Sequence, residues 1–161
     1  MKECIELEEK QQLPQIKLML LGDGELRENT ERLANQMGIA SRVLFLGNRR
    51  DIYRYYQAMD FFLLPSFYEG LPGTAIEAQA SGLPGIISDT ITHEAVITER
   101  FTQKDISTTA RVWAEEIIRY MPAESMGREG YEEKVRKAGF DVKEQVVRMQ
   151  KFYLCGEWED A

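Results

Sequence analysis

Residues 60–89, DFFLLPSFYEGLPGTAIEAQASGLPGIISD, contain two short apolar runs separated by an alanine-rich segment. The runs DFFLLP (60–65) and GIIS (85–88) are brief and end at proline or polar residues, as buried parallel strands do. The segment GTAIEAQASG (73–82) ends at a glycine, which is typical of a helix and its C-terminal stop. Strand, helix and strand in this order predict two parallel strands joined by a right-handed crossover.

The same alternation continues on both sides of this stretch. Further strands are predicted at IKLMLL (16–21), RVLFL (42–46) and AVIT (95–98). Helices are predicted at 24–38, where Leu26, Leu33 and Met37 recur near helical spacing, and at 51–59. After residue 107 the pattern is helical, with segments near 108–120, 124–138 and 141–154 that we expect to cover the sheet. We therefore predict one α/β domain over residues 1–161, a Rossmann-like doubly wound parallel sheet with a helical tail at about 108–155.

Composition narrows the possible functions. The chain has 161 residues, is 43% hydrophobic and carries a net charge of −7, which argues against a nucleic-acid partner. It contains no apolar run of the roughly 18 residues that a membrane span needs, and no signal peptide opens it. Cys4 and Cys155 lie at opposite ends, and His93 is the one histidine. We therefore expect no metal site and a reducing, cytoplasmic setting.

The loop after the strand at 60–64 is built to approach an anion. Ligands of doubly wound sheets bind beyond the carboxyl ends of the strands, and residues 66–73 form such a loop. Gly70 and Gly73 allow close approach of the backbone, Pro72 suits a first helical turn, and Thr74 offers a hydroxyl. The unpaired amides of the following helix can bind a phosphate without a lysine.

Two carboxylates flank this turn. Glu77 is expected about one turn into the helix, where its two oxygens can accept hydrogen bonds from the vicinal hydroxyls of a ribose. Glu69, on the loop, would face a different part of the same long ligand. The residues alone leave another interpretation open, in which Glu69 only caps the helix and Glu77 is a solvated helix residue.

Several motifs together resemble one enzyme family. LLGDGEL, VLFLGNRRDI, YYQAMDFFLLPSFYEGLP, IEAQASGLPGIISD and ITHEA are similar, in order and spacing, to the C-terminal half of bacterial group 1 (family 4) glycosyltransferases of the capsular or exopolysaccharide type. The resemblance implies a GT-B enzyme, in which two Rossmann-like domains hold a donor mainly in the C-terminal one. It implies a retaining, hexosyltransferase-type transfer of a sugar from a UDP- or GDP-sugar to a polysaccharide or lipid-linked acceptor, with peripheral association at the inner face of the plasma membrane.

The resemblance also implies roles for single residues. Glu69 would act at the transferred sugar as the catalytic residue, and Glu77 would bind the ribose. Sugar hydroxyls and the distal phosphate would contact the backbone of Gly70, Leu71, Pro72, Gly73 and Thr74. The pyrophosphate loop would contain Gly22 and Gly24, and the nucleobase pocket would be lined by Gly47, Asn48 and Arg49. Because the chain has no Asp-X-Asp motif, we expect no metal or other cofactor. His93 could contact the diphosphate or the sugar, or be an incidental loop residue.

The sequence also departs from the family. A strand with a glycine-arginine pair, a following lysine and the whole N-terminal acceptor domain have no counterpart here, so we expect the isolated chain to be inactive. Loss of that strand, which is central in the common order, predicts a disturbed sheet or self-association. A truncated, non-catalytic nucleotide-sugar-binding or vestigial module is the main alternative. A phosphorylase or a sugar-nucleotide epimerase is a further one, for which no suitably placed lysine or acid–base pair is recognised.

Overall fold

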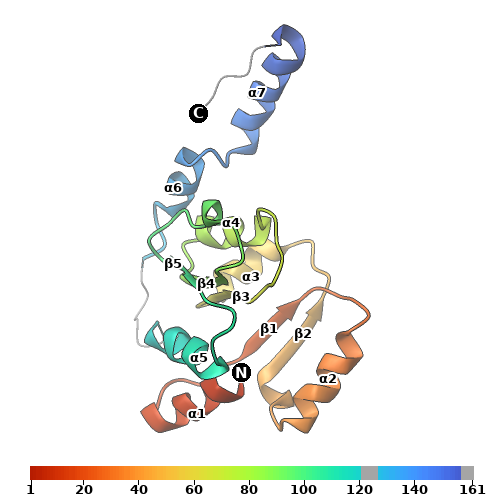
Figure 1. The fold of residues 1–161 in the computed structure, drawn as a ribbon, viewed down its shortest axis with the longest axis vertical. Coiled ribbons are helices and arrows are strands. Elements are labelled where there is room, and N and C mark those ends of the chain that lie inside the picture. Colours follow the sequence, from red (N-terminus) through yellow and green to blue (C-terminus); the bar gives the residue numbers. More distant parts are fainter. Residues whose placement is uncertain (121–126, 157–161) are drawn as a thin grey trace. The chain divides into compact units, whose positions relative to one another are not determined.

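The structure, a computed structural model, describes residues 1–120 and 127–156. These residues form two compact units. Unit 1 comprises residues 1–58 and the segment that begins at Ser107, and unit 2 comprises residues 59–106 and the described C-terminal residues. Figure 1 follows the chain through both units by colour.

Unit 1 combines a short parallel sheet with helices. Its elements are α1 (Lys2–Gln11), β1 (Leu18–Leu21), α2 (Arg27–Gln36), the 3-10 helix η1 (Ala40–Arg42), β2 (Val43–Gly47), α3 (Ile52–Ala58) and α5 (Ala110–Arg119). β1 and β2 are parallel neighbours, with Leu18 opposite Val43 (Figure 1). Cys4 and Leu7 of α1 share a buried cluster with Ala114 and Ile118 of α5. Burial raises the pKa of the Cys4 thiol.

An ion pair fixes α1 to the start of β1 and to η1. The Arg42 guanidinium lies 3.0 Å from Glu8 Oε1, and both side chains are largely buried. Glu8 Oε2 also accepts a hydrogen bond from the Ile16 amide at 2.7 Å, and Arg42 donates to the Ile16 carbonyl at 3.0 Å. Both oxygens of Glu8 and both terminal nitrogens of Arg42 therefore meet a partner, and such partners offset the cost of burying an ion pair.

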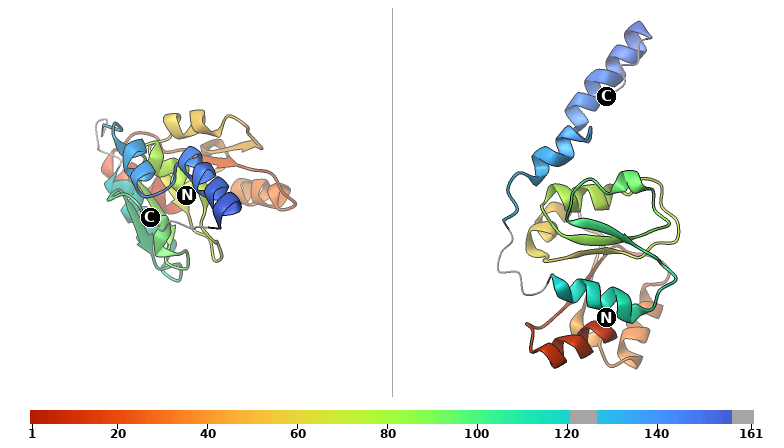
Figure 2. Two further views of the ribbon diagram at one scale, coloured as in Figure 1. Left: turned by 90° about the horizontal axis from the view of Figure 1, so that it is seen from above. Right: turned by 60° about the vertical axis from the view of Figure 1, so that its left-hand side comes forward.

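Unit 2 is organised around a central strand. Its elements are β3 (Phe62–Leu64), α4 (Gly73–Ala80), β4 (Gly85–Ser88), the 3-10 helix η2 (His93–Ala95), β5 (Phe101–Lys104), α6 (Tyr131–Lys137) and α7 (Val142–Cys155). The parallel strands lie in the order β3-β4-β5. All four residues of β4 are buried. Figure 2 shows α4 over one face of this sheet, and α6 packs beside α4.

These parallel strands with flanking helices confirm the α/β prediction, and four of the five predicted strands are present. The strand predicted at 95–98 is wrong. Ile97 and Thr98 donate their amides to the side chain of Gln79, so this backbone is not available for a strand ladder. The fifth strand is instead β5, whose Phe101 stacks on Phe62 of β3 with ring centroids 5.7 Å apart.

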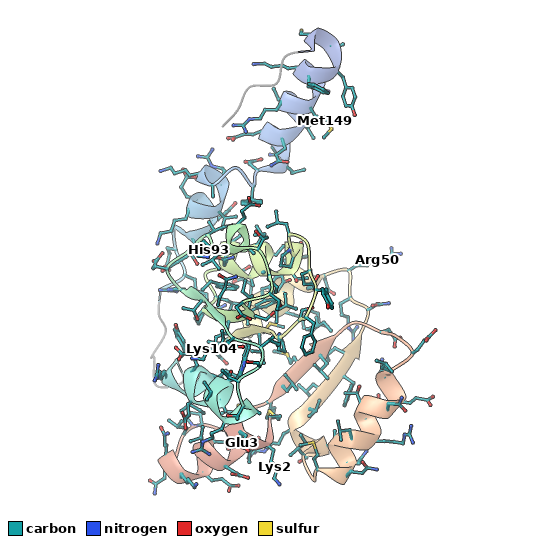
Figure 3. All side chains as sticks on the ribbon, viewed as in Figure 1. Lys2, Glu3, Arg50, His93, Lys104 and Met149 are labelled. Carbon is teal, nitrogen blue, oxygen red and sulfur yellow. The ribbon has the colours of Figure 1, made fainter. Side chains whose placement is uncertain are left out.

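The helix predicted at 24–38 is present as α2, which buries Ala34, while Leu26, Leu33 and Met37 are exposed. The expectation that the C-terminal helices cover the sheet is wrong for α7. None of the side chains of α7 is buried, so this helix does not cover the sheet, as the side chains around Met149 in Figure 3 illustrate. The part of the predicted helical tail at 121–126 lies outside the described residues. Along the described ranges, no helix combines the length and the apolar character needed to cross a membrane.

The described strands do not form the one continuous sheet of the predicted doubly wound fold. Instead of one continuous sheet, the described strands form a two-stranded sheet, β1-β2, and a three-stranded sheet, β3-β4-β5. The predicted neighbours of the missing strand, β1 and β3, thus belong to different sheets. The prediction of a single domain over the whole chain, and that of self-association, stay predictions.

Candidate functional site

The loop between β3 and α4 carries Glu69 at the carboxyl end of β3. Residues 67–71 are all exposed, including Phe67 at 65% and Tyr68 at 92%. β3 and β4 are parallel, so this loop leaves the sheet at the same edge as the segment after β4. Sheets of this kind bind their ligands beyond the carboxyl ends of the strands, which is where this loop lies.

The start of α4 presents free amides. Its first intrahelical hydrogen bond runs from the Ala75 amide to the Pro72 carbonyl at 3.0 Å, so the amides of Gly73 and Thr74 precede the helical ladder. The buried Pro72 is the N-cap, one position earlier than the predicted first-turn place. No described side chain caps α4, which contradicts the interpretation of Glu69 as a helix cap.

Glu77 lies on the side of α4 that carries Gly73 and Thr74, whose amides point out of the start of the helix. It is the fifth residue of the helix and is exposed, about 6 Å along the axis from the first residue. Gly73 and Thr74 precede it by four and three positions, the spacings that place helical residues on one side. Chemically, the start of α4 can hold an anion at its amides, and the Glu77 carboxylate can accept two hydroxyl donors.

Gln79, which the sequence analysis missed, ties α4 to the segment after β4. Its fully buried amide donates to the Ala95 carbonyl at 2.8 Å and accepts from the Ile97 and Thr98 amides, each at 2.9 Å. One feature of the sequence could have identified Gln79. It is the one polar residue among the buried residues of α4, which also include Ala75, Ile76 and Ala78. Gln79 thereby holds the helix that carries Glu77 against the segment that leads from η2 to β5.

Two hydroxyls that sequence reasoning also missed contact the start of the Glu69 loop. Ser88 Oγ at the end of β4 donates to the Ser66 carbonyl, and Thr90 Oγ1 donates to the same oxygen at 2.8 Å. These partners are 22 and 24 residues apart in sequence, so no local pattern reveals them.

His93 stands in η2 at the same edge of unit 2 (Figure 3). Gln103 donates its amide nitrogen to the Ile91 carbonyl at 2.6 Å, which turns its oxygen toward His93 Nδ1 at 2.9 Å. Nδ1 must therefore carry a proton and donate it, and in the neutral ring Nε2 is the free acceptor. The imidazole is exposed and oriented, and its contact with a ligand stays a prediction.

The predicted glycines of unit 1 meet at the ends of β1 and β2. The Gly22 amide donates to the Gly47 carbonyl at 2.9 Å. Gly22 has φ of 131° and Gly47 has φ of 66°, backbone conformations that other residues rarely adopt. Gly24 follows Gly22 in the same turn, and its amide contacts its neighbour Asp23 at 3.1 Å.

Asn48 and Arg49, the other predicted residues of unit 1, are exposed. The Arg49 guanidinium lies over the Tyr55 ring, 6.0 Å from its centroid. The structure therefore brings the predicted residues together in two groups, residues 22–49 in unit 1 and residues 69–77 in unit 2. Their individual roles stay predictions.

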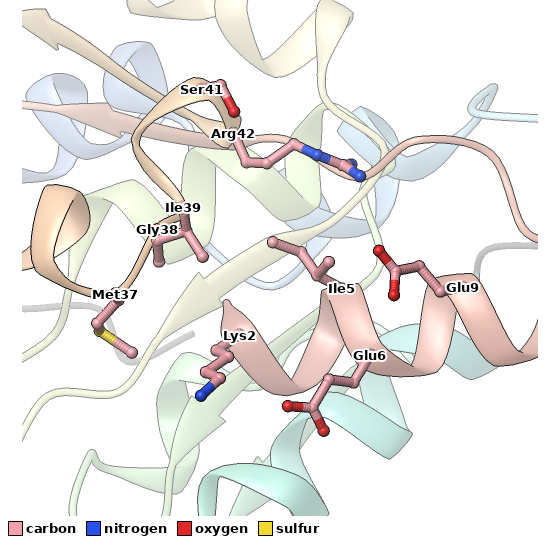
Figure 4. A pocket seen from close by; sticks show the side chains of 9 residues that line it. All are labelled: Lys2, Ile5, Glu6, Glu9, Met37, Gly38, Ile39, Ser41 and Arg42. Atoms are coloured by element: carbon pink, nitrogen blue, oxygen red, sulfur yellow. The ribbon is translucent and has the colours of Figure 1, made fainter.

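A groove in unit 1 lies away from all the predicted residues. It has a volume of about 310 Å³ and runs between α1 and the segment that joins α2 to β2 (Figure 4). Ile5 and Ile39 face each other across it, and Lys2, Glu6 and Glu9 form its rim. Arg42, at one end, is already engaged by Glu8. The groove therefore offers no charged group aimed at a ligand beyond that exposed rim.

Known proteins share the sequence and fold of this chain. The family described as Glycosyl transferases group 1 matches residues 1–121. A Bacillus subtilis (strain 168) protein named as glycosyltransferase EpsF is 39% identical over 144 residues, which are 89% of this chain and 38% of EpsF. The Escherichia coli UDP-Gal:alpha-D-GlcNAc-diphosphoundecaprenol alpha-1,3-galactosyltransferase is 36% identical over 90 residues, 55% of this chain and 23% of that enzyme. The chain thus spans well under half the length of these relatives.

Solved structures agree on the fold. Sucrose-phosphate synthase from Thermosynechococcus elongatus superposes with a TM-score of 0.74 at 25% identity, over 95% of this chain and 41% of the other. Anabaena Alr3699/HepE, solved in complex with UDP, superposes with a TM-score of 0.63 at 21% identity, over 86% and 41% of the two chains. This chain therefore belongs to the group 1 glycosyltransferases and has the Rossmann-like α/β fold of a GT-B C-terminal domain.

Proposed function

We propose that this chain is the donor-binding half of a retaining, hexosyltransferase-type family 4 glycosyltransferase. The enzyme would transfer a sugar from a UDP- or GDP-sugar to a polysaccharide or lipid-linked acceptor. One observation carries the proposal: the amides of Gly73 and Thr74 precede the helical ladder of α4, and Glu77 lies one turn along the side of the helix that carries these residues, at the carboxyl ends of parallel strands.

Each of these groups has a proposed partner in the donor. The Gly73 and Thr74 amides, with the backbone of Gly70–Pro72, bind the distal phosphate and sugar hydroxyls. The Glu77 carboxylate accepts hydrogen bonds from the two ribose hydroxyls, and Glu69 acts at the transferred sugar. Because these amides oppose the charge that develops on the leaving diphosphate, the scheme needs no metal ion.

Retention of configuration follows in this scheme from attack on the face that the leaving group occupies. A phosphate oxygen of the donor helps to deprotonate the acceptor hydroxyl, and no covalent intermediate with the protein forms. In unit 1, Gly22 and Gly24 belong to the pyrophosphate loop, and Gly47, Asn48 and Arg49 to the nucleobase pocket. The nucleotide named for the Escherichia coli relative and the UDP complex of the Anabaena protein support a nucleoside diphosphate donor.

The acceptor side of the reaction is proposed to lie outside these residues. The chain spans 38% of the length of EpsF, which is consistent with a further domain that binds the acceptor. Work in polysaccharide assembly would place the full enzyme in the cytoplasm, at the inner face of the plasma membrane, and the divided sheet supports self-association or pairing with a further segment. The partial coverage also favours a second candidate, a module that binds a nucleotide sugar without catalysing transfer.

Isothermal titration calorimetry with UDP and GDP tests the donor site. We expect one of the two nucleotides to bind the wild-type chain, and Glu77→Ala to weaken that binding at least about tenfold, because two hydrogen bonds to a carboxylate are lost. Glu132→Ala removes the same charge from an exposed position of α6 and should leave the affinity unchanged.

The outcomes separate the candidates. Binding that depends on Glu77 supports a preserved donor site, and transfer activity after addition of an acceptor domain then distinguishes an enzyme from a binding module. Failure of both nucleotides to bind, or equal affinity of Glu77→Ala and the wild type, refutes the proposal.

A further inference from the structure

The loop that carries Glu69 has little packing to hold it. Residues 67–71 are exposed, so burial of apolar surface contributes little to their position. At its far end the loop joins the buried Pro72, the N-cap of α4. Whatever holds Glu69 in one place must therefore act on the backbone near Ser66.

Two hydroxyls saturate the Ser66 carbonyl. Ser88, fully buried at the end of β4, donates Oγ–H to this oxygen, and Thr90 donates to it at 2.8 Å. The Thr90 and Ser88 hydroxyl oxygens are themselves 3.1 Å apart. A carbonyl oxygen has two lone pairs, so both are used, and two donors fix the plane of the peptide that joins Ser66 to Phe67.

A third hydroxyl extends this restraint to Glu69. Ser66 Oγ donates to the Tyr68 carbonyl at 3.2 Å, and that carbonyl belongs to the peptide that joins Tyr68 to Glu69. Hydrogen bonds to and from Ser66 thus link the end of β4 to the peptide that precedes Glu69. We call Ser66, Ser88 and Thr90 the hydroxyl relay.

We propose that the hydroxyl relay positions Glu69 for the transferred sugar. Ser88 and Thr90 do not themselves touch the donor in this scheme and act as positioning residues through Ser66. The proposal rests on the proposed function for the role of Glu69, and on the hydrogen bonds alone for the immobilisation of the loop. A relay anchored in the buried strand β4 lets an exposed acid keep the single geometry that a site of this kind needs.

Backbone dynamics of the full chain test the immobilisation. We would measure ¹⁵N order parameters of the amides of residues 67–70 in the wild type, Thr90→Val and Ser88→Ala. Rigid backbone has order parameters of about 0.85 and flexible backbone falls below about 0.6, and both variants should move the loop toward the lower value. Thr90→Ser keeps the hydroxyl and should restore the wild-type values. Thr102→Val, an exposed position of β5 in the same sheet, is the matched control.

Ligand affinity tests the role of the relay in sugar binding. We would compare the affinity for UDP-glucose with that for UDP, and the affinity for GDP-mannose with that for GDP. The difference in each pair measures how much the sugar adds to the affinity. Loss of one hydrogen bond should reduce that sugar-dependent gain about fivefold in Thr90→Val, while the affinity for the bare nucleotide stays constant. A purely structural role would weaken both ligands alike. The Glu69→Ala/Thr90→Val double variant should bind no more weakly than Glu69→Ala alone, because both changes act on one contact.

The results distinguish failure of the relay from failure of the proposed function. Unchanged order parameters in both Thr90→Val and Ser88→Ala overturn the relay, whatever the ligand data. A more mobile loop with an undiminished sugar-dependent gain overturns its role in positioning Glu69. If the wild-type protein binds none of the four ligands, the proposed function is refuted. In that case a more mobile loop in the variants would still support immobilisation of the loop by the relay.

Discussion

The two units use different chemistry to fix a helix against the rest of the fold. In unit 1, α1 is held by the ion pair of Glu8 and Arg42, which also engages the backbone of Ile16. In unit 2, α4 is held by the neutral amide of Gln79, which engages the backbone of residues 95–98. Both anchors satisfy backbone groups that have no strand partner.

This difference predicts which unit should be more sensitive to pH. An ion pair depends on the protonation of its carboxylate, whereas an amide does not titrate. The unit with the predicted acids Glu69 and Glu77 has the uncharged anchor. The geometry of that candidate site is therefore expected to be less sensitive to pH through its anchor than the fold of unit 1.

Breaking the neutral anchor should have the largest effect. Gln79→Leu keeps the volume but removes the partner of the buried Thr98 amide, the partly buried Ile97 amide and the Ala95 carbonyl, and each unsatisfied buried group costs about 1–3 kcal/mol. We expect unit 2 to lose about 4 kcal/mol of unfolding free energy, measured by denaturant titration with hydrogen exchange of residues 75–98. Gln150→Leu, on the exposed α7, should change it by less than about 0.5 kcal/mol. Equal effects of the two changes would contradict the assignment of Gln79 as an anchor.

Breaking the ion pair of Glu8 and Arg42 should cause the second-largest loss of unfolding free energy. Arg42→Ala leaves the Glu8 carboxylate buried without its cation, a change that typically costs about 3 kcal/mol. The fluorescence of the buried Trp113 reports the unfolding of unit 1 in a Trp158→Phe background. Arg27→Ala breaks a half-exposed pair in α2 and should cost less than about 1 kcal/mol. A loss for Arg42→Ala no larger than that for Arg27→Ala would show that the buried pair stabilises nothing.

The response to pH sharpens the comparison further. Burial alone would raise the pKa of Glu8, but hydrogen bonds from Arg42 and the Ile16 amide outweigh it and lower the pKa. A carboxyl with a lowered folded pKa contributes stability that is fully present above its unfolded value of about 4.3 and is lost as pH falls through the folded pKa. The Trp113 unfolding midpoint should therefore fall in acid, and fall less steeply in Glu8→Gln. Parallel slopes for the two proteins between pH 6 and pH 3 would rule out this linkage.

The smallest effect is expected at the C-terminal end of unit 2. Val146→Pro should disrupt α7, which would be seen as lost helical circular dichroism, yet change the unfolding free energy of the Gln79 region by less than about 0.5 kcal/mol. Val135→Ala, in the buried face of α6, should cost about 2 kcal/mol. A large loss of stability in Val146→Pro would mean that α7 packs on unit 2 in solution.

The elements that sequence reasoning predicted well are those with local signals. The strand at 60–64, the loop around Glu69 and the helix from Gly73 lie next to one another in the chain, so turn residues and apolar runs were sufficient. The strand predicted at 95–98 failed because the backbone amides of Ile97 and Thr98 donate to Gln79, which lies 18 and 19 residues earlier in the sequence. The spacing of Leu26 and Leu33 predicted the helix α2 correctly, but only contacts decide which side of a helix is buried, and both side chains are exposed.

By itself, the sequence determined the order of strands and helices in α/β alternation and the position of two acids around a helix start. These follow from periodicity and turn chemistry, which act over a few residues. Only the tertiary structure decided that the strands form two sheets, and that Gln79, Ser88 and Thr90 anchor the candidate site. The physical reason is that a hydrogen-bond partner is chosen by distance in space, which the folded chain creates between residues that are far apart in sequence.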